Sequence, residues 1–285
     1  MVEFGSVWSR TGEMRHGTDG SPPFLKWAGG KRWFASRYLY LIPTQFERYI
    51  EPFLGSGALF FAIKPPRAIL ADLNADLIAT YLAVQGNWKR VVRILGEYHR
   101  RHSKDFYYLV RSSQPRTLHG RAARFIYLNR TCWNGLYRVN IRGRFNVPMG
   151  TKEKVLLNAD DFFQTSALLK GATLIASDFE RVVCQARKGD LIFADPPYVT
   201  AHSQNGFLKY NEKLFSWEDQ VRLRDALLDA KKRGAAVVAT NANTPVIRGL
   251  YAQHFRVFSA SRSSVIASNA KNRGRTSELI ICTGG

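Results

Sequence analysis

The stretch around Asp195 constrains the fold more than any other part of the chain, because an apolar run there meets two prolines. Asp190-Leu191-Ile192-Phe193 is typical of a short buried strand, and Ala194-Asp195-Pro196-Pro197-Tyr198 follows it directly. Proline cannot donate to a central hydrogen-bond ladder, so the chain has to leave the sheet at this point. Open α/β sheets bind their ligands at the carboxyl ends of strands. We therefore predict an α/β fold with a ligand site at Asp195.

Two side chains give this strand end a specific chemistry. The carboxylate of Asp195, beside the carbonyl of the rigid Pro196, offers two acceptors, which is enough to hold both hydrogens of an amino group. The ring of Tyr198 can stack on a flat heterocycle. Taken alone, the segment is equally well interpreted as a proline-terminated strand with a structural tyrosine.

A second strand end carries a glycine loop. Residues 48–53 are predicted to form a strand, and residues 54–61 a glycine turn that opens a helix. This arrangement lets a cofactor approach a helix N-terminus. The third glycine of the dinucleotide fingerprint is absent, and the acidic Glu51 precedes the loop. Glu51 would repel a pyrophosphate but suits a cationic ligand such as a sulfonium or an amine.

The next predicted strand, residues 67–71, ends on Asp72. Asp72 follows Gly55 by 17 positions, which is close to the spacing at which an acidic residue binds ribose hydroxyls in such folds. The alternative is that Asp72 caps the next helix. Asn74 is the better candidate for that cap, because residues 75–85 are apolar at helical spacing.

Residues 24–31 are expected to form the first ordered element. Two glycines between Trp27 and Lys31 let backbone approach a ligand closely, and Lys31 supplies charge beside them. A simple glycine turn that leads into a helix at residues 32–41 is the alternative interpretation.

The alternation of strands and helices stops between Trp88 and Asp160, where basic and aromatic residues are dense. We predict an inserted, mostly helical domain there. Arg142-Gly143, flanked by short alternating runs, predicts a hairpin or tight loop with Arg138 and Arg144 projecting, unless this is only a solvated basic loop. The predicted organisation is a flexible tail at residues 1–20, a catalytic domain at residues 21–86 and 161–285, and the insert at residues 87–160.

The α/β pattern resumes after the insert. Thr173-Leu174-Ile175-Ala176 is a predicted strand that runs into Asp178 and Phe179, another polar and aromatic strand end. The loop of residues 201–216 follows the Asp195 strand and is long enough to be an active-site flap.

The remaining elements are predicted from local signals. Ser216 and Asp219 form a capping box that opens a helix, and Gly234 marks the end of that helix. Further strands are predicted at residues 235–240, 255–258 and 278–282, with a basic loop at residues 261–276 that contacts a backbone phosphate.

The charge balance indicates a polyanionic partner. The chain has 42 Lys and Arg against 22 Asp and Glu, a net charge of +20 and a pI of about 10.2. Nucleic acid is the commonest partner of such a chain, although anionic lipid or a basic surface that serves solubility stays open. Three isolated cysteines argue against a disulfide framework or a metal site and fit a reducing cytosol. No apolar run is long enough to span a membrane.

Four segments in order, residues 24–31, 51–58, 129–148 and 195–198, resemble the DNA adenine methyltransferase family, the Dam-like D12 class of N6-adenine-specific enzymes. The resemblance covers nearly the whole chain from Phe24 onwards. It implies a doubly wound, seven-stranded methyltransferase sheet with an inserted helical target-recognition domain. It also implies S-adenosyl-L-methionine as the cofactor, double-stranded DNA as the substrate, a cytoplasmic location and a monomer. A functional pairing with a restriction endonuclease stays open.

The resemblance implies roles for individual residues. The catalytic residues would be Asp195, Pro196, Pro197 and Tyr198. The cofactor would be bound by Trp27, Lys31, Glu51, Phe53, Gly55, Ser56, Gly57, Asp72, Asp178, Phe179 and Asp195. DNA would be contacted by Lys26, Arg130, Trp133, Asn134, Leu136, Arg138, Asn140, Asn146 and Pro148. Trp133 departs from the family, which usually has a smaller aromatic wedge at that position.

The sequence also bears on other methyltransferase activities. Carbon-5 cytosine methylation needs a cysteine after proline, whereas Cys184 follows Val183. Cytosine amino methyltransferases usually carry Ser rather than Asp before the prolines. An RNA methyltransferase and a catalytically inactive DNA-binding regulator stay open. The recognition block at residues 129–148 looks most like that of enzymes reading GATC, and longer sites that begin with GAT are the alternative.

Overall fold

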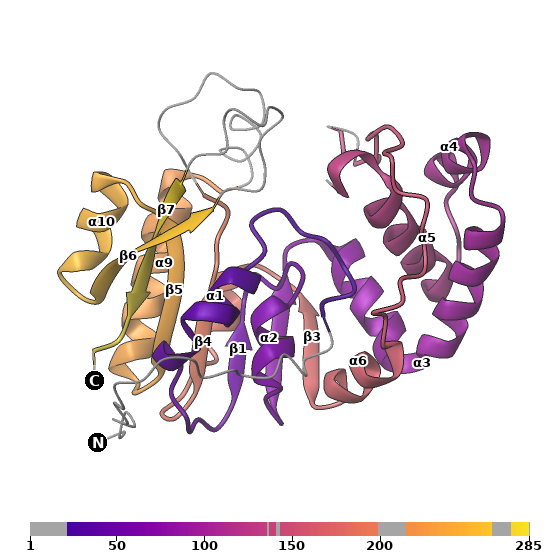
Figure 1. Cartoon of the computed structure of the whole chain (residues 1–285). Coiled ribbons are helices and arrows are strands. Elements are labelled where there is room, and N and C mark those ends of the chain that lie inside the picture. The colour runs from indigo at the N-terminus through magenta and orange to yellow at the C-terminus, as the bar shows by residue number, and fades with distance from the viewer. Residues whose placement is uncertain (1–21, 136, 141–142, 199–214, 264–274, 285) are drawn as a thin grey trace, which may run out of the picture.

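A seven-stranded sheet forms the centre of the computed structural model, which describes residues 22–135, 137–140, 143–198, 215–263 and 275–284 (Figure 1). The strand order is β3-β2-β1-β4-β5-β7-β6. Neighbouring strands are parallel from β3 to β5, and β7 is antiparallel to both β5 and β6. The strands are β1 (Tyr49–Glu51), β2 (Ala68–Asp72), β3 (Ala172–Ala176), β4 (Leu191–Ala194), β5 (Ala236–Ala242), β6 (Arg256–Ser263) and β7 (Arg275–Cys282).

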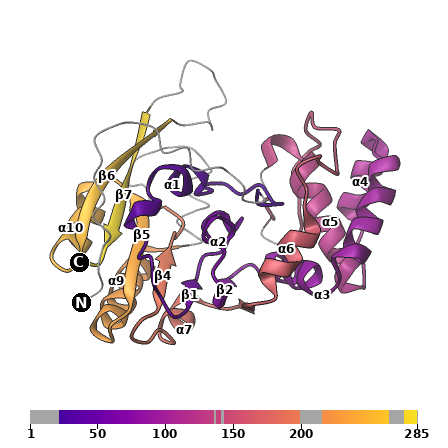
Figure 2. The same cartoon turned by 60° about the horizontal axis from the view of Figure 1, so that its bottom comes forward.

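Helices cover both faces of the sheet, because alternate strand residues feed two separate cores. In β4, Phe193 packs in the core under the first group of helices, whereas Ile192 packs in the core under the second group. Figure 2 shows the two layers on opposite sides of the sheet. The first group is α1 (Arg32–Arg37), the 3-10 helix η1 (Leu39–Leu41), α2 (Ala58–Ile63) and the start of α3 (Ala75–Arg100); the second is α7 (Phe179–Val183), α9 (Trp217–Lys232) and α10 (Pro245–Ala252). The predicted doubly wound sheet is confirmed.

The insert grows out of the long helix α3, which continues from the sheet into the helical layer at the right of Figure 1. The Asn74 side chain accepts a hydrogen bond from Leu77 N at 3.1 Å, so the predicted cap is confirmed. Asn87 alone has non-helical dihedrals (φ −151°, ψ 76°) inside α3. This interruption lies at the expected start of the insert, and we propose the domain limits of the sequence analysis on that ground. The other helices of this region are α4 (Lys104–Ser112), α5 (Leu118–Thr131), η2 (Trp133–Gly135) and α6 (Phe162–Leu169).

The capping box predicted at the start of α9 is confirmed, whereas the loop predicted before β7 has the wrong limits. Both bonds of the capping box are present, from Asp219 N to Ser216 Oγ (3.2 Å) and from Ser216 N to Asp219 Oδ2 (2.9 Å). The loop expected at residues 261–276 is wrong at both ends, because β6 continues to Ser263 and β7 begins at Arg275.

The expected tail at residues 1–20, and residues 201–214 of the expected flap, lie outside the described residues. Among the described helices, none has the length and apolarity needed to cross a membrane.

Candidate active site

Asp195 follows β4 directly and is held by two side chains from different elements. Its Oδ1 accepts hydrogen bonds from Lys31 Nζ at 2.8 Å and from Thr240 Oγ1 at 2.7 Å. Lys31 is the N-cap residue of α1, and Thr240 lies in β5, the neighbour of β4. Both contacts fall on Oδ1, and none of the described residues forms a hydrogen bond or ion pair with Oδ2, so this second oxygen can accept from an incoming donor. The Asp195 side chain keeps 18% of its surface exposed, so a ligand has access to it.

Tyr198 is linked to the same group through β7. Its hydroxyl donates to Glu278 Oε2, and the Lys31 ammonium lies 4.9 Å from the centroid of its ring. Lys31 Nζ is also 3.5 Å from Glu278 Oε2. Sequence reasoning missed Glu278 and Thr240. The available signal for Glu278 was an acidic residue at the head of the apolar run Leu279-Ile280-Ile281-Cys282, where it is 2% exposed.

Electrostatics give these groups different protonation behaviour. Burial raises the pKa of Asp195, while the charge of Lys31 and the hydrogen bonds from Lys31 and Thr240 oppose that rise. Burial, with the nearby charges of Asp195 and Glu278, raises the pKa of Tyr198 well above its ordinary value. Tyr198 therefore stays a phenol that donates a hydrogen bond, whereas Asp195 is an acceptor that Lys31 helps to keep ionised.

The glycine loop between β1 and α2 is built for close packing. Gly55 has a φ of +47°, and a Cβ there would lie 2.6 Å from Cδ1 of Trp27. Gly57 has a φ of +63° and is the N-cap residue of α2. Both positions need glycine, Gly55 also because the Trp27 ring lies directly on the loop. Ser56 between them is buried.

Asp72 holds this loop in place. Its Oδ2 accepts from Gly55 N at 3.0 Å and its Oδ1 from Asn74 N at 2.9 Å. Burial raises the pKa of Asp72, and these backbone bonds oppose the rise. The observed role of Asp72 is to join the end of β2 to the glycine loop and to the start of α3. Its binding to ribose remains a prediction.

Glu51, at the end of β1, adds a third carboxyl group to this part of the molecule. It is 3% exposed and accepts from the Tyr49 hydroxyl at 2.9 Å. Burial raises the pKa of Glu51 well above its ordinary value, against the effect of the Tyr49 bond, and the charges of Asp195 and Asp72 raise it further. Carboxyl groups that repel one another in this way favour a bound cation.

Phe53 and Phe179 stack with ring centroids 5.4 Å apart and an interplanar angle of 28°, so the structure brings these two predicted residues together. Asp178 caps α7 through a 2.9 Å bond from Glu180 N.

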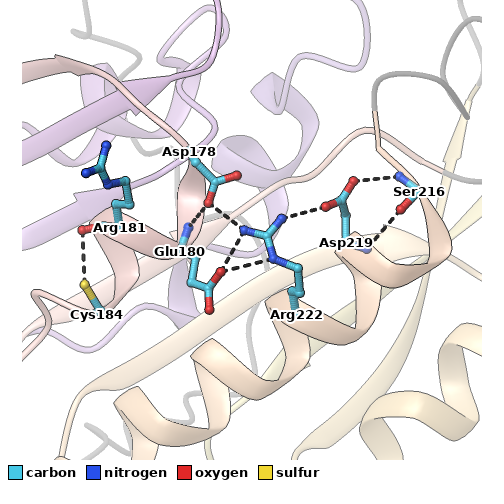
Figure 3. A network of polar contacts seen from close by, with 7 residues as sticks. All are labelled: Asp178, Glu180, Arg181, Cys184, Ser216, Asp219 and Arg222. Carbon is cyan, nitrogen blue, oxygen red and sulfur yellow. Dashed lines mark hydrogen bonds and ion pairs between the residues drawn. The ribbon is translucent and has the colours of Figure 1, made fainter.

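Arg222 of α9, which sequence reasoning missed, binds three carboxylates around this segment (Figure 3). Its ion pairs reach Asp178 at 3.0 Å, Glu180 at 2.7 Å and Asp219 at 2.7 Å. Its guanidinium also lies 4.9 Å from the centroid of the Phe179 ring. Arg222 therefore connects the segment that begins α7 to the first turn of α9.

Within residues 129–148, the described residues on either side of 141 and 142 pair as the predicted hairpin requires, while 141 and 142 themselves lie outside the described residues. Val139 and Phe145 make an antiparallel bridge, and Asn140 N donates to Arg144 O at 2.8 Å. Most of the predicted DNA-contacting side chains are exposed, while Leu136 lies outside the described residues. The exposed predicted residues are Lys26, Trp133, Asn134, Arg138, Asn140, Asn146 and Pro148.

Lys26 joins this block to the segment before α1. Its backbone N donates to Asn129 Oδ1 at 2.9 Å, and its carbonyl accepts from Asn129 Nδ2 at 2.7 Å. Gly135 packs on the Lys26 side chain, since a Cβ on Gly135 would lie 2.9 Å from Lys26 Cδ. The indigo segment before α1 accordingly reaches across to α5 in Figure 1.

The prediction that Arg130 contacts DNA is wrong. Arg130 is 1% exposed, and its guanidinium makes a two-point ion pair with Asp160 at 2.6 and 2.7 Å. The same group donates to the carbonyls of Phe24 at 2.8 and 3.2 Å and of Val155 at 2.7 Å. Arg130 therefore joins α5 to the segments around Phe24 and Asp160, and its donors are taken up by these buried partners.

Comparison with known proteins agrees with this geometry. The family described as "D12 class N6 adenine-specific DNA methyltransferase" matches residues 27–266. The Type II methyltransferase M1.LlaDCHI of Lactococcus lactis subsp. cremoris is 34% identical over 272 residues, which cover 92% of this chain and 95% of that protein. The DNA adenine methylase of Serratia marcescens is 32% identical (90% and 96% covered), and that of Escherichia coli K12 is 30% identical (90% and 93%). The chain belongs to the D12 class and is an adenine-specific DNA methyltransferase.

Proposed function

We propose that this enzyme transfers a methyl group from S-adenosyl-L-methionine to the N6 amino group of an adenine extruded from double-stranded DNA, within the sequence GATC. The observation that carries the proposal is the Asp195 carboxylate, which is held at Oδ1 by Lys31 and Thr240 and is accessible to a ligand. Family membership implies the use of S-adenosyl-L-methionine and a DNA substrate.

The residues beside Asp195 fit this cofactor. S-Adenosyl-L-methionine supplies an electrophilic methyl group on a sulfonium when it is bound. Burial is the main cause of the raised pKa of Glu51, and the charges of Asp195 and Asp72 raise it further, so a cationic centre would be favourable beside these carboxyl groups. Trp27 and the loop from Gly55 to Gly57 would hold its body, and Asp72 its ribose. The stacked rings of Phe53 and Phe179, beside Asp178, offer an apolar wall for its adenine.

The catalytic residues act on the substrate base. An adenine inside a duplex is out of reach, so it has to leave the stack before it reacts. Tyr198 offers a ring on which the extruded base stacks. Asp195 Oδ2 accepts one amino hydrogen and the Pro196 carbonyl accepts the other, and both acceptors draw electron density toward N6. The side chains contribute by positioning and by oriented acceptors, and no covalent enzyme intermediate is needed.

The hairpin supports the reading of base edges. Arg138 is exposed on it, with the amides of Asn134, Asn140 and Asn146 exposed on the same block. Arginine that donates twice to guanine, with asparagine beside it, is a standard chemistry of direct readout. The resemblance of the block to that of GATC-reading enzymes favours GATC. The alternative is a longer site beginning with GAT, in a restriction–modification setting; one relative is named as a Type II methyltransferase.

A substrate panel tests the proposal. Purified enzyme is given tritium-labelled S-adenosyl-L-methionine with duplexes that contain GATC, a longer GAT site or only cytosine targets, and with single-stranded RNA. Transfer to every GATC duplex, blocked by N6-methyladenine at the target position, is expected. Transfer restricted to one longer site would replace GATC by that site. Transfer to RNA or to cytosine alone would overturn the proposal.

A further inference from the structure

Glu278 is a buried acidic residue for which the proposed function assigns no task. It lies in β7 opposite Ala242 of β5 and Ala260 of β6. Ile280, two residues further along β7, is opposite Thr240. Residues two apart in a strand share a face of the sheet, so Glu278 and Ile280 point to the same side. Residues directly opposite each other on neighbouring strands also share a face, so Thr240, which binds Asp195, points to that side as well.

The contacts of Glu278 lead to both groups that would hold the base. Its Oε2 accepts the hydroxyl of Tyr198, the proposed stacking ring. The same oxygen lies 3.5 Å from Lys31 Nζ, which is 2.8 Å from Asp195 Oδ1. Glu278 Oε2 therefore contacts the proposed stacking ring, Tyr198, directly. The same oxygen is linked to Asp195, the proposed acceptor of the amino group, through the ammonium of Lys31.

Lys31 is suited to this link. It is 4% exposed and also donates to the Gly29 carbonyl at 2.8 Å, so its three donors point in fixed directions. A buried charge of this kind is stable only with partners in good geometry. The charge of Glu278 thus stabilises Lys31 in the position from which it binds Asp195.

We propose that Glu278 is a positioning residue for the target base, which fixes the Tyr198 ring through its hydroxyl and holds Lys31 on Asp195. The ring and the acceptor are then set relative to each other before the base arrives. This inference rests on the proposed function, because it takes Tyr198 and Asp195 as the residues that contact adenine. Substrate is touched by those two residues, and Glu278 acts through them.

Glu278→Gln, Tyr198→Phe and the double variant test the link. Glu278→Gln keeps the size of the side chain and removes its charge; Tyr198→Phe keeps the ring and removes the donor. A duplex with 2-aminopurine in place of the target adenine reports base position, because stacking on an aromatic ring quenches its emission. The cofactor dissociation constant is measured alongside.

Both single variants should lower kcat by about tenfold, as expected for a hydrogen bond to a charged group. Both should also raise the 2-aminopurine emission, while cofactor affinity stays unchanged. The double variant should be little worse than Glu278→Gln alone, because the two changes remove one shared contact. Wild-type kcat and emission in Glu278→Gln, or losses that multiply in the double variant, would overturn the inference.

Asp190→Asn is the matched control. Asp190 is a buried carboxylate, 3% exposed, that directly precedes β4 and therefore lies at the opposite end of that strand from Asp195; it pairs with Arg48 at 2.7 Å. Asp190→Asn should lower stability and leave the 2-aminopurine emission unchanged. If Glu278→Gln does not fold, Tyr198→Phe tests the same contact from its other side.

The failure of the inference differs from that of the proposed function. Normal transfer by Asp195→Ala would remove the proposed function. An inactive Asp195→Ala, together with a normal Glu278→Gln, would remove only the positioning role.

Discussion

The ammonium of Lys31, at the start of α1, lies 2.8 Å from the carboxylate of Asp195, at the end of β4. From the sequence, the resemblance to the family implied that Lys31 lines the cofactor pocket, beside two glycines that let backbone approach a ligand. The structure gives it a second partner, the residue proposed to accept the amino hydrogen of adenine. This contact couples the charge of Asp195 to an element from the other end of the chain.

Lys31→Met should move the acidic limb of the pH profile of kcat to higher pH. In the proposed function the ionised form of Asp195 accepts the amino hydrogen, and burial raises the pKa of Asp195. The Lys31 charge opposes that rise, so removing it raises the pKa of Asp195 further and activity is lost at a higher pH as pH falls. The profile is measured at saturating cofactor, with Lys232→Met as the control because Lys232 forms an exposed pair with Asp229. An unshifted limb would contradict the role assigned to Lys31.

Arg222→Ala should weaken cofactor binding without abolishing catalysis. The change releases Asp178 and the Phe179 ring from α9 (Figure 3). The dissociation constant for S-adenosyl-L-methionine, measured by calorimetry, should rise by roughly 3- to 10-fold, because partly exposed ion pairs contribute on the order of 1 kcal/mol. Arg224→Ala is the control, since Arg224 lies on the same helix and pairs only with Asp225 among the described residues. Equal effects of the two changes would count against a positioning role for Arg222.

Arg130→Met and Arg138→Ala should separate structure from recognition. Arg130→Met leaves Asp160 and two carbonyls without their buried donor, so the free energy of unfolding should fall by roughly 3–5 kcal/mol.

Arg138 is exposed, so Arg138→Ala should leave stability unchanged and lose about 1–3 kcal/mol of discrimination at one base pair. Urea unfolding and competition between duplexes measure the two effects. A uniform loss on all sequences in Arg138→Ala would make Arg138 a phosphate contact.

Gly55→Ala should destabilise the loop under Trp27. A Cβ at Gly55 meets the indole ring at 2.6 Å, and the φ of +47° is unfavourable for alanine, so a loss of about 1–3 kcal/mol in unfolding free energy is expected. Gly249→Ala is the matched control, because Gly249 is exposed in α10 with open space around its Cβ position. That change should stabilise the protein by about 0.5–1 kcal/mol. Thermal unfolding of both variants measures the two changes in stability. A Gly55→Ala variant as stable as the wild type would contradict the requirement for glycine under Trp27.

Local sequence patterns predicted the elements that local physics determines. The cap at Asn74 and the capping box of Ser216 depend on residues within one turn, and both are present. The end of the strand at Asp195 was predicted because proline excludes a continued ladder. The alternation of strands and helices likewise predicted an α/β fold, whereas the doubly wound sheet was implied by the resemblance to the family.

Contacts between distant segments were out of reach of the same reasoning. Thr240 reaches Asp195 because β5 is the neighbour of β4, and Glu278 reaches Lys31 and Tyr198 from β7, the next strand; strand order is a property of the whole sheet. Arg130 belongs to a basic region that the sequence reads as exposed, but in the structure it is 1% exposed and pairs with Asp160, 30 residues away. The helix that contains Ala75 runs on to Arg100, past non-helical dihedrals at Asn87 and well beyond residues 75–85, whose helical spacing predicted it.

Methyl transfer by Asp195→Ala is the most direct test of the account, because Asp195 is the residue from which the proposed chemistry follows. The variant keeps the glycine loop, Trp27 and Asp72, so it should bind S-adenosyl-L-methionine nearly as well as the wild type. It should transfer no tritium to a duplex containing the target adenine. Transfer at the wild-type rate would contradict the assignment of Asp195 as the acceptor of the adenine amino group.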